Sequence, residues 1–308
     1  MELRAGPEDA GARLDAFLAE PVGSRAQAQR LIEDGAVLVD GAVVRKRHRI
    51  EAGETVTVEL PPDPGPSPPV AAPAAFAVRY EDDDVLVVDK PAGVVVHPAR
   101  GHRSGTLSQA LAGVAAGGEE GRAGIVHRLD RDTTGLLVVA RSPEAHRRLK
   151  AALQARAITR EYLALVEGRP PARTGTVDAP IGRDRRHRRR MSTDTDDPRD
   201  AVTHFEVEEA LPETTLLRVR LETGRTHQIR AHLRAIGHPV VGDPEYGTPG
   251  GLGLERQFLH AARLRFDQPT TGAEVDVSSP LPEDLRAALE RARAGGARRS
   301  PATPPDLR

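Results

Sequence analysis

The chain has 308 residues, enough for two domains and a sizeable hydrophobic core. Its formal net charge is −1, so no global positive field draws it to nucleic acid, and any RNA-binding surface must be local. The absence of cysteine excludes disulfides, thiolate nucleophiles and zinc sites built on cysteine. The sequence shows no apolar signal core and no run of about 18 apolar residues, so we expect a cytoplasmic protein without a membrane segment.

Residues 1–60 predict a small domain made of two helices and a hairpin, which follows a short lead over residues 1–11. The apolar residues near its start have helical spacing, and Ser24 with Gln27 has the spacing of a capping box. An Asp-Gly pair between valine-rich segments is typical of a tight β-hairpin. The expected elements are a helix near 14–18, a helix over 24–35, a hairpin over 37–44 and a strand over 56–60.

Proline and small residues dominate residues 61–75, PPDPGPSPPVAAPAA, which suit neither a helix nor a sheet. We expect a semi-rigid linker there, and therefore a boundary between two domains with separate cores. The second domain is expected over 76–293. The tail over 294–308 has the composition of a disordered segment.

Strand patterns outnumber regular crossover helices in the second domain, which predicts an α+β fold with a mixed sheet. Strands are expected over 85–88, 136–140, 162–166, 202–207, 215–221 and 264–266. Helices are expected over 104–115, 143–155, 226–236 and 283–293.

The polar run HRLDRDTTG, from His127 to Gly135, directly precedes a wholly apolar strand pattern. In extended backbone Arg128 and Asp130 would face the same side, because side chains alternate along a strand. The two hydroxyl residues and the glycine that follow suit a tight turn. A hydrophobic core does not need this arrangement, whereas a site that extrudes a base and attacks it could use it.

This run resembles the signature of the RluA-type pseudouridine synthases, and of their RluC/RluD-like branch in particular. The resemblance extends over roughly residues 12–280. Further family-like segments are DKPAGVVVHP from residue 89, TREYLA from 159, ETGRTHQIRAHL from 222 and GDPEYG from 242. The resemblance implies a mixed-sheet α+β catalytic domain that isomerises uridine in RNA without a metal, nucleotide or redox cofactor.

The resemblance also implies three catalytic residues. Asp130 matches the catalytic aspartate, although attack on C1′, attack on the base and removal of a proton from C2′ all stay open as its role. Arg230 matches the arginine that pairs with this aspartate, where a guanidinium would stabilise and aim the carboxylate. Tyr162 matches the tyrosine that stacks on the flipped uracil. The alternative interpretations are a structural ion pair on a helix for Arg230 and a half-buried core aromatic residue for Tyr162.

The first domain resembles the S4-type RNA-binding domain, on the segments RLD from residue 13, AQRLI from 28 and VDG from 39. Its basic residues predict a positive face for phosphates, and a solvated charged surface is the alternative. The residues expected to contact RNA are Arg25, Arg30, Lys46 and Arg47 in this domain, and Arg128, Arg225 and His227 in the second. Arginines crowded over 183–190 suit phosphate contact or a solvated loop.

Other polar residues have simpler interpretations. We interpret GDPEYG as a structural loop and Asp132 as a turn or surface residue. Asp130 and Asp132 could instead be the two carboxylates of a glycoside or nucleoside hydrolase. No metal site is expected, because the histidine spacings match no zinc-binding pattern. The histidines considered are His227, His232, His238 and His260.

We therefore expect a monomeric, cofactor-independent RNA pseudouridine synthase. Its expected substrate is structured RNA of the large ribosomal subunit, which the small domain binds while the large domain isomerises uridine. The alternative from another class is a non-catalytic RNA-binding or ribosome-assembly protein.

Overall fold

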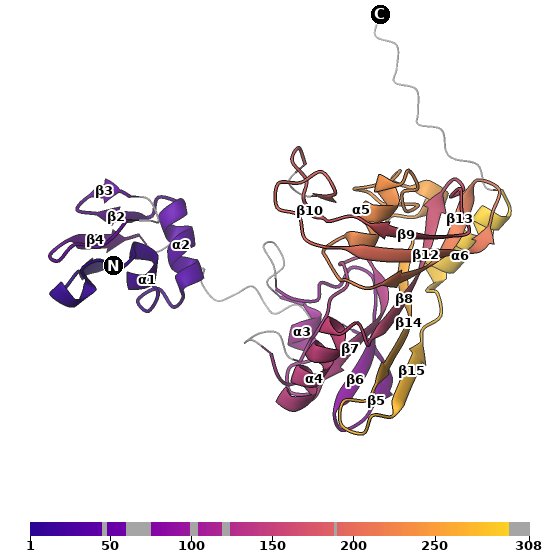
Figure 1. Cartoon of the computed structure of the whole chain (residues 1–308), viewed down its shortest axis with the longest axis horizontal. Coiled ribbons are helices and arrows are strands. Elements are labelled where there is room, and N and C mark those ends of the chain that lie inside the picture. Colours follow the sequence, from indigo (N-terminus) through magenta and orange to yellow (C-terminus); the bar gives the residue numbers. More distant parts are fainter. Residues whose placement is uncertain (45–47, 60–74, 99–103, 119–123, 188–189, 296–308) are drawn as a thin grey trace, which may run out of the picture. The chain divides into compact units, whose positions relative to one another are not determined.

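The computed structural model describes every residue except 45–47, 60–74, 99–103, 119–123, 188–189 and 296–308. It divides the chain into two compact units, Met1–Pro69 and Val70–Arg308, each with its own sheet (Figure 1). Nearly all of the expected linker and tail lies outside the described residues. None of the described helices is long and apolar enough to cross a membrane.

The first unit packs two short helices against an antiparallel sheet with the strand order β1-β4-β2-β3. Alternation along β2 and β4 buries Val37, Val39, Val56 and Val58 on one face, where Leu14 of the first helix also lies. The elements are β1 (Glu2–Arg4), η1 (Pro7–Asp9), α1 (Leu14–Phe17), α2 (Arg25–Glu33), β2 (Val37–Val39), β3 (Ala42–Val43) and β4 (Thr55–Val58).

The expected hairpin is present, and one expectation about this unit is wrong. Asp40 and Gly41 have φ angles of 46° and 79°, the left-handed values that a type I′ turn requires. Residues 1–11 are not merely a lead, because Glu2–Arg4 pair with β4 as strand β1. Three residues carry too little alternation for a strand to be predicted from sequence.

The second unit is built on a nine-stranded mixed sheet with the order β5-β6-β7-β14-β8-β13-β12-β9, in which β15 pairs with β14 (Figure 1). Strands β7 and β14 are parallel, and the other pairs in this sheet are antiparallel. The strands are β5 (Ala77–Glu81), β6 (Val85–Lys90), β7 (Thr134–Ala140), β8 (Thr159–Glu167), β9 (Thr174–Asp178), β12 (Val202–Ala210), β13 (Thr214–Leu221), β14 (Leu259–Asp267) and β15 (Glu274–Ser278). The smaller elements are α3 (Leu107–Ala110), α4 (Pro143–Gln154), β10 (Gly182–Arg183), β11 (Met191–Ser192), α5 (Gln228–Ala235), η2 (Gly251–Gly253) and α6 (Glu283–Arg293). This is the α+β fold with a mixed sheet that the sequence predicts.

Both faces of β7 are buried, which explains its apolar sequence. Leu137 faces one core cluster with α3, α5 and α6, whereas Leu136 faces a second cluster with α4 on the other side of the sheet. Gly135 is required where β7 meets β14. Its φ is 110°, and a Cβ there would lie 2.2 Å from the carbonyl oxygen of Ala261.

One predicted helix is much shorter than expected. The helix expected over 104–115 is limited to Leu107–Ala110. Gly105 and Gly113 have φ angles of 70° and 90°, so left-handed backbone lies on both sides of it. The other predicted strands and helices of this unit are present, with boundaries that differ by a few residues.

Because each unit has its own core, we expect the second unit to fold alone. Deleting residues 1–62 should leave a cooperative thermal unfolding transition and weaken binding to a large structured RNA. Circular dichroism melts and filter binding of the full and shortened chains measure both effects. An unfolded shortened chain would show that the second unit depends on the first.

Candidate active site

The sheet register brings three distant segments of the second unit together. The loop 127–133 leads into β7, which pairs with β14, and β14 places Ala261 opposite Tyr162 of β8. Strand β8 also pairs with β13, where Glu161 lies opposite Arg220. The loop that follows β13 therefore lies beside β8, close to the loop that precedes β7.

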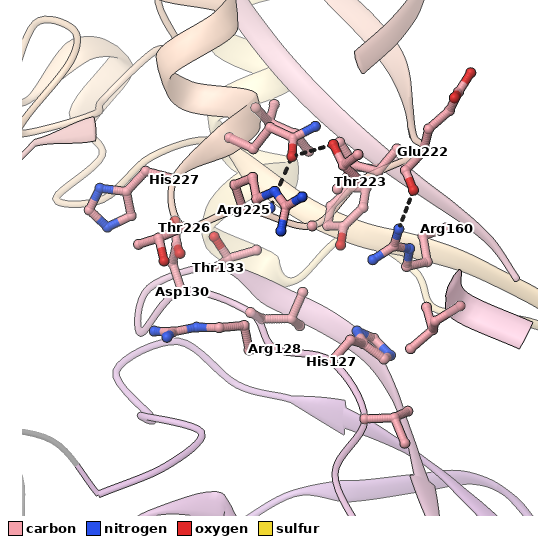
Figure 2. Close-up of a pocket in the computed structure, with 18 of the residues that line it drawn as sticks. His127, Arg128, Asp130, Thr133, Arg160, Glu222, Thr223, Arg225, Thr226 and His227 are labelled. Carbon is pink, nitrogen blue, oxygen red and sulfur yellow. Dashed lines mark hydrogen bonds between the residues drawn. The ribbon is translucent and has the colours of Figure 1, made fainter. Parts of the chain in front are cut away.

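These segments enclose a pocket of about 630 Å³ (Figure 2). The three catalytic candidates line it, together with the three residues of this unit expected to contact RNA. They are Asp130, Tyr162, Arg230, Arg128, Arg225 and His227. Residues that the sequence places far apart therefore share one cavity.

Arg230 is the central cation of this pocket and is only 4% exposed. Its Nη1 donates to Asp130 Oδ2 at 3.1 Å, so the expected ion pair is present. Its Nε and Nη2 donate to the two carboxylate oxygens of Asp243 at 2.6 and 2.8 Å, and Nη2 also donates to Glu245 at 3.0 Å. Burial alone would lower the pKa of Arg230, but these carboxylates raise it above its ordinary value.

The GDPEYG segment carries two of the carboxylates that bind Arg230, and so belongs to the site as well as to the fold. Asp243 is fully buried and also accepts the backbone N–H groups of Glu245 and Tyr246. The Tyr246 ring centre lies 4.9 Å from the guanidinium carbon of Arg230. This contact was not predicted from the sequence, where the available signal was the pair of acids Asp243 and Glu245 close in the chain to Arg230.

A buried lysine supports the loop that carries Asp130. Lys90, at the end of β6, is fully buried. Its Nζ donates to the carbonyl oxygens of Pro91, Val94 and Arg131 at 2.8, 3.0 and 2.8 Å. Burial lowers the pKa of Lys90 to about 7. The bond to Arg131 ties the backbone directly after Asp130 to the turn that follows β6.

Arg256 holds the same loop from a second side. Its Nη1 donates to the carbonyl oxygen of Asp132 at 2.9 Å, and its Nε and Nη2 bind Asp284 at the start of α6. The Asp132 side chain pairs with Arg131 and does not line the pocket. This placement agrees with the interpretation of Asp132 as a turn or surface residue.

The three residues near the pocket that were expected to contact RNA differ in their surroundings. Arg128 is exposed and forms no hydrogen bond with any residue that the structure describes. Arg225 donates from Nε to the carbonyl oxygen of Asp200 at 3.0 Å. His227 directly precedes α5 with a φ of 54°, and burial lowers its pKa despite the nearby carboxylates. Arg128 is therefore the freest of the three for a ligand.

In the first unit, Arg25 has a structural partner. The carboxylate of Asp15 is fully buried and accepts hydrogen bonds from Arg13, Arg25 and Gln29. These bonds, led by Arg13, lower the pKa of Asp15. The Arg25 side chain is still 54% exposed and so stays open to RNA. Lys46, Arg47 and the side chain of Arg30 lie outside what the structure describes.

The end of α4 contributes to the pocket, which the sequence analysis did not foresee. Lys150, Gln154 and Arg156 line it and are exposed. Arg156 pairs with Glu222 of the loop after β13. Helical spacing predicted the helix itself but gave no sign that its last turn borders a cavity.

In the arginine-rich loop over 183–190, Arg185 pairs with Asp194 and Asp196. Arg188 and Arg189 lie outside the described residues.

The other three histidines considered above form hydrogen bonds with other residues of the chain. His232 contacts the Thr203 hydroxyl and the Ala179 carbonyl oxygen. His238 contacts the backbone of β8, and His260 contacts Thr134 and the backbone at residue 279. Among the described residues, no group of three or more acids and histidines is arranged to hold a metal ion.

The buried Lys90 should make stability depend on pH. Between roughly pH 7 and 10 the unfolded lysine holds a proton that the folded one releases, so stability rises with pH in this window. Relative to Lys90→Met, the wild type should gain up to about 1.4 kcal/mol of unfolding free energy per pH unit. Urea unfolding at several pH values measures this, with Lys150→Met as the control for the lost charge. If the difference in unfolding free energy between the wild type and Lys90→Met does not change with pH, the lowered pKa of Lys90 is contradicted.

The chain is similar to known proteins over most of its length. The family model for RNA pseudouridylate synthase matches residues 84–235, and the S4 domain model matches residues 12–56. The chain is 45% identical over 302 residues to the uncharacterized RNA pseudouridine synthase YlyB of Bacillus subtilis, covering 96% of this chain and 99% of that protein. It is 44% identical over 310 residues to the ribosomal large subunit pseudouridine synthase D of Xanthomonas campestris, covering 94% and 91%. The solved structure of human RNA pseudouridylate synthase domain containing 1 aligns with a TM-score of 0.54 and 30% identity, covering 68% of this chain and 84% of that one. The chain therefore belongs to the RNA pseudouridine synthase family.

Proposed function

We propose that this chain is a cytoplasmic enzyme that isomerises uridine in large-subunit ribosomal RNA, with Asp130 as its catalytic carboxylate. The observation that carries the proposal is the contact of Asp130 with the buried Arg230 in a pocket that Tyr162 also lines. Two relatives, from Xanthomonas campestris and Pseudomonas aeruginosa, are named for the large ribosomal subunit, at 44% and 45% identity. We also propose that the chain acts as a monomer.

The reaction requires a carboxylate but no change of oxidation state. The N1–C1′ bond of uridine breaks, the base turns, and C5 bonds to C1′. The proton on C5 is then released, and N1 takes up a proton. Asp130 is the group in the pocket that fits attack on C1′, attack on the base or removal of the C2′ proton. Its side chain is 16% exposed, which leaves it open to a flipped nucleotide while Arg230 holds it from behind.

Tyr162 fits the role of a stacking surface. It is 4% exposed, faces the pocket from β8, and burial raises its pKa above the ordinary value. The hydroxyl therefore stays neutral at physiological pH, so the flat ring is what Tyr162 offers to a uracil. Arg128, exposed and two residues before Asp130, suits a contact with the RNA from which the base is extruded.

The two alternatives receive less support from this geometry. A hydrolase with paired carboxylates would need Asp132 to face the substrate, but its side chain pairs with Arg131 outside the pocket. A non-catalytic RNA-binding protein would have no use for an aspartate fixed by a buried arginine, because this arrangement aims a carboxylate rather than binding phosphate.

Asp130→Asn should abolish isomerisation and leave RNA affinity within about tenfold, because it removes the charge and keeps the shape. Release of tritium from C5-labelled uridine in a ribosomal RNA transcript measures the reaction. Asp132→Asn is the matched control and should retain activity. Substantial turnover by Asp130→Asn would remove Asp130 from the chemistry, and free uracil as the product would indicate a hydrolase.

Substitutions of Arg230 should slow the chemistry more than they weaken RNA binding. Arg230→Lys keeps the charge and loses the planar fork, so its single-turnover rate should lie between those of the wild type and Arg230→Ala. Arg230→Ala also leaves the buried Asp243 unpaired, which should cost about 3–5 kcal/mol of stability. Rapid-quench kinetics, with urea unfolding as the stability control, test this. Equal rates for the three proteins would show that Arg230 does not act through Asp130.

A further inference from the structure

One buried arginine of the pocket lacks a counter-charge. Three arginines of the described residues are buried: Arg160, Arg230 and Arg256. Carboxylates bind the last two at short distance, whereas Arg160 forms no ion pair with any described residue. Its Nη2 donates to the carbonyl oxygen of Glu222 at 3.3 Å, and its buried Nε has no partner. Burying a cation in this way is unfavourable unless a ligand supplies an acceptor.

His127 also lines this pocket, and its ring carries a second buried donor without a partner. The backbone N–H of Val138 donates to His127 Nε2 at 3.2 Å, so the ring carries its proton on Nδ1. This Nδ1 is buried and has no partner. Burial and the Arg160 cation lower the pKa of His127 to about 3, so the ring is a neutral donor at physiological pH. In Figure 2, His127 and Arg160 lie on the side of the pocket away from His227.

We propose that Arg160 and His127 bind a phosphate of the RNA backbone next to the uridine that is isomerised, an inference that rests on the proposed function. A full positive charge without a partner favours an anion over a neutral uracil carbonyl. Arg160 and Tyr162 project from the same face of β8, about 7 Å apart along the strand, which is the scale of one nucleotide. A base on Tyr162 therefore leaves its neighbouring phosphate within reach of Arg160.

Gly224 has no side chain, and this leaves room for the guanidinium of Arg160. A Cβ at this position would lie 2.9 Å from Arg160 Nη1, so the flexible end of the Arg160 side chain would have to shift. Gly224→Ala therefore displaces the guanidinium without removing its charge, and is a second probe that does not rely on substituting a buried arginine.

The test uses phosphorothioate interference with full-length protein. Large-subunit ribosomal RNA transcripts carry sulfur in place of one phosphate oxygen at random nucleotides. RNA retained by each protein is cleaved with iodine to find the positions where sulfur weakens binding. For the wild type, sulfur should weaken binding at one phosphate next to the uridine that is isomerised. That uridine is identified in the same RNA. Arg160→Gln and Gly224→Ala should lose this discrimination, and kcat/KM should fall about ten- to hundredfold.

Arg263→Gln is the matched control, because Arg263 is exposed on β14, pairs with Asp276 and does not line the pocket. It should keep the wild-type interference. The melting temperature of RNA-free Arg160→Gln should be unchanged or higher, since an uncompensated buried charge is removed. A lower melting temperature with intact interference would make Arg160 a structural residue and overturn the proposal.

Two further results would also overturn it. Unchanged phosphate discrimination in Arg160→Gln or Gly224→Ala is one of them. The other is that these variants lose discrimination against 4-thiouridine instead, which would assign Arg160 to a uracil carbonyl. A wild type that isomerises no uridine would instead refute the proposed function, so the two failures are distinguishable.

Discussion

The site depends on one buried guanidinium that three carboxylates share. Arg230 can be buried because Asp243 binds it through both oxygens and Glu245 adds a third acceptor. One nitrogen of the fork is left to face Asp130, so the position of this carboxylate follows from the position of the arginine. Asp243 in turn organises its own loop by accepting two backbone N–H groups. A cavity whose acid is fixed in this way is organised before RNA arrives.

The sheet supplies the rigidity that this ion pair needs. Strand β7 is buried on both faces, and the loop in front of it is bound by Lys90 from β6 and by Arg256, which α6 anchors through Asp284. Arg230 and Arg160 then represent two uses of a buried arginine. Carboxylates of the chain neutralise Arg230, which positions Asp130, the carboxylate that we propose is catalytic, whereas we propose that Arg160 is left for an anion of the substrate.

Sequence patterns predicted the parts that follow local rules. The apolar run of β7 and the helical periodicity of α6 predicted elements of the mixed-sheet fold. The family-like HRLD, TREYLA and GRTHQIR segments led to Asp130, Tyr162 and Arg230. The strands β5, β9 and β15 were missed because each has only five residues, most of them exposed, which is a short window for a periodic pattern. The contact of Asp243 with Arg230 and the lack of a counter-charge at Arg160 depend on packing, which no single segment of sequence records.

The most direct test of this account is the single-turnover rate of Asp243→Asn on a large-subunit ribosomal RNA transcript. Asp243 is fully buried and does not line the pocket, so this change cannot remove a contact with RNA. It keeps the shape of the side chain and removes the charge that anchors Arg230. We predict a rate at least about tenfold below that of the wild type, with unchanged RNA affinity. A wild-type rate would contradict the claim that the shared guanidinium holds Asp130 in place.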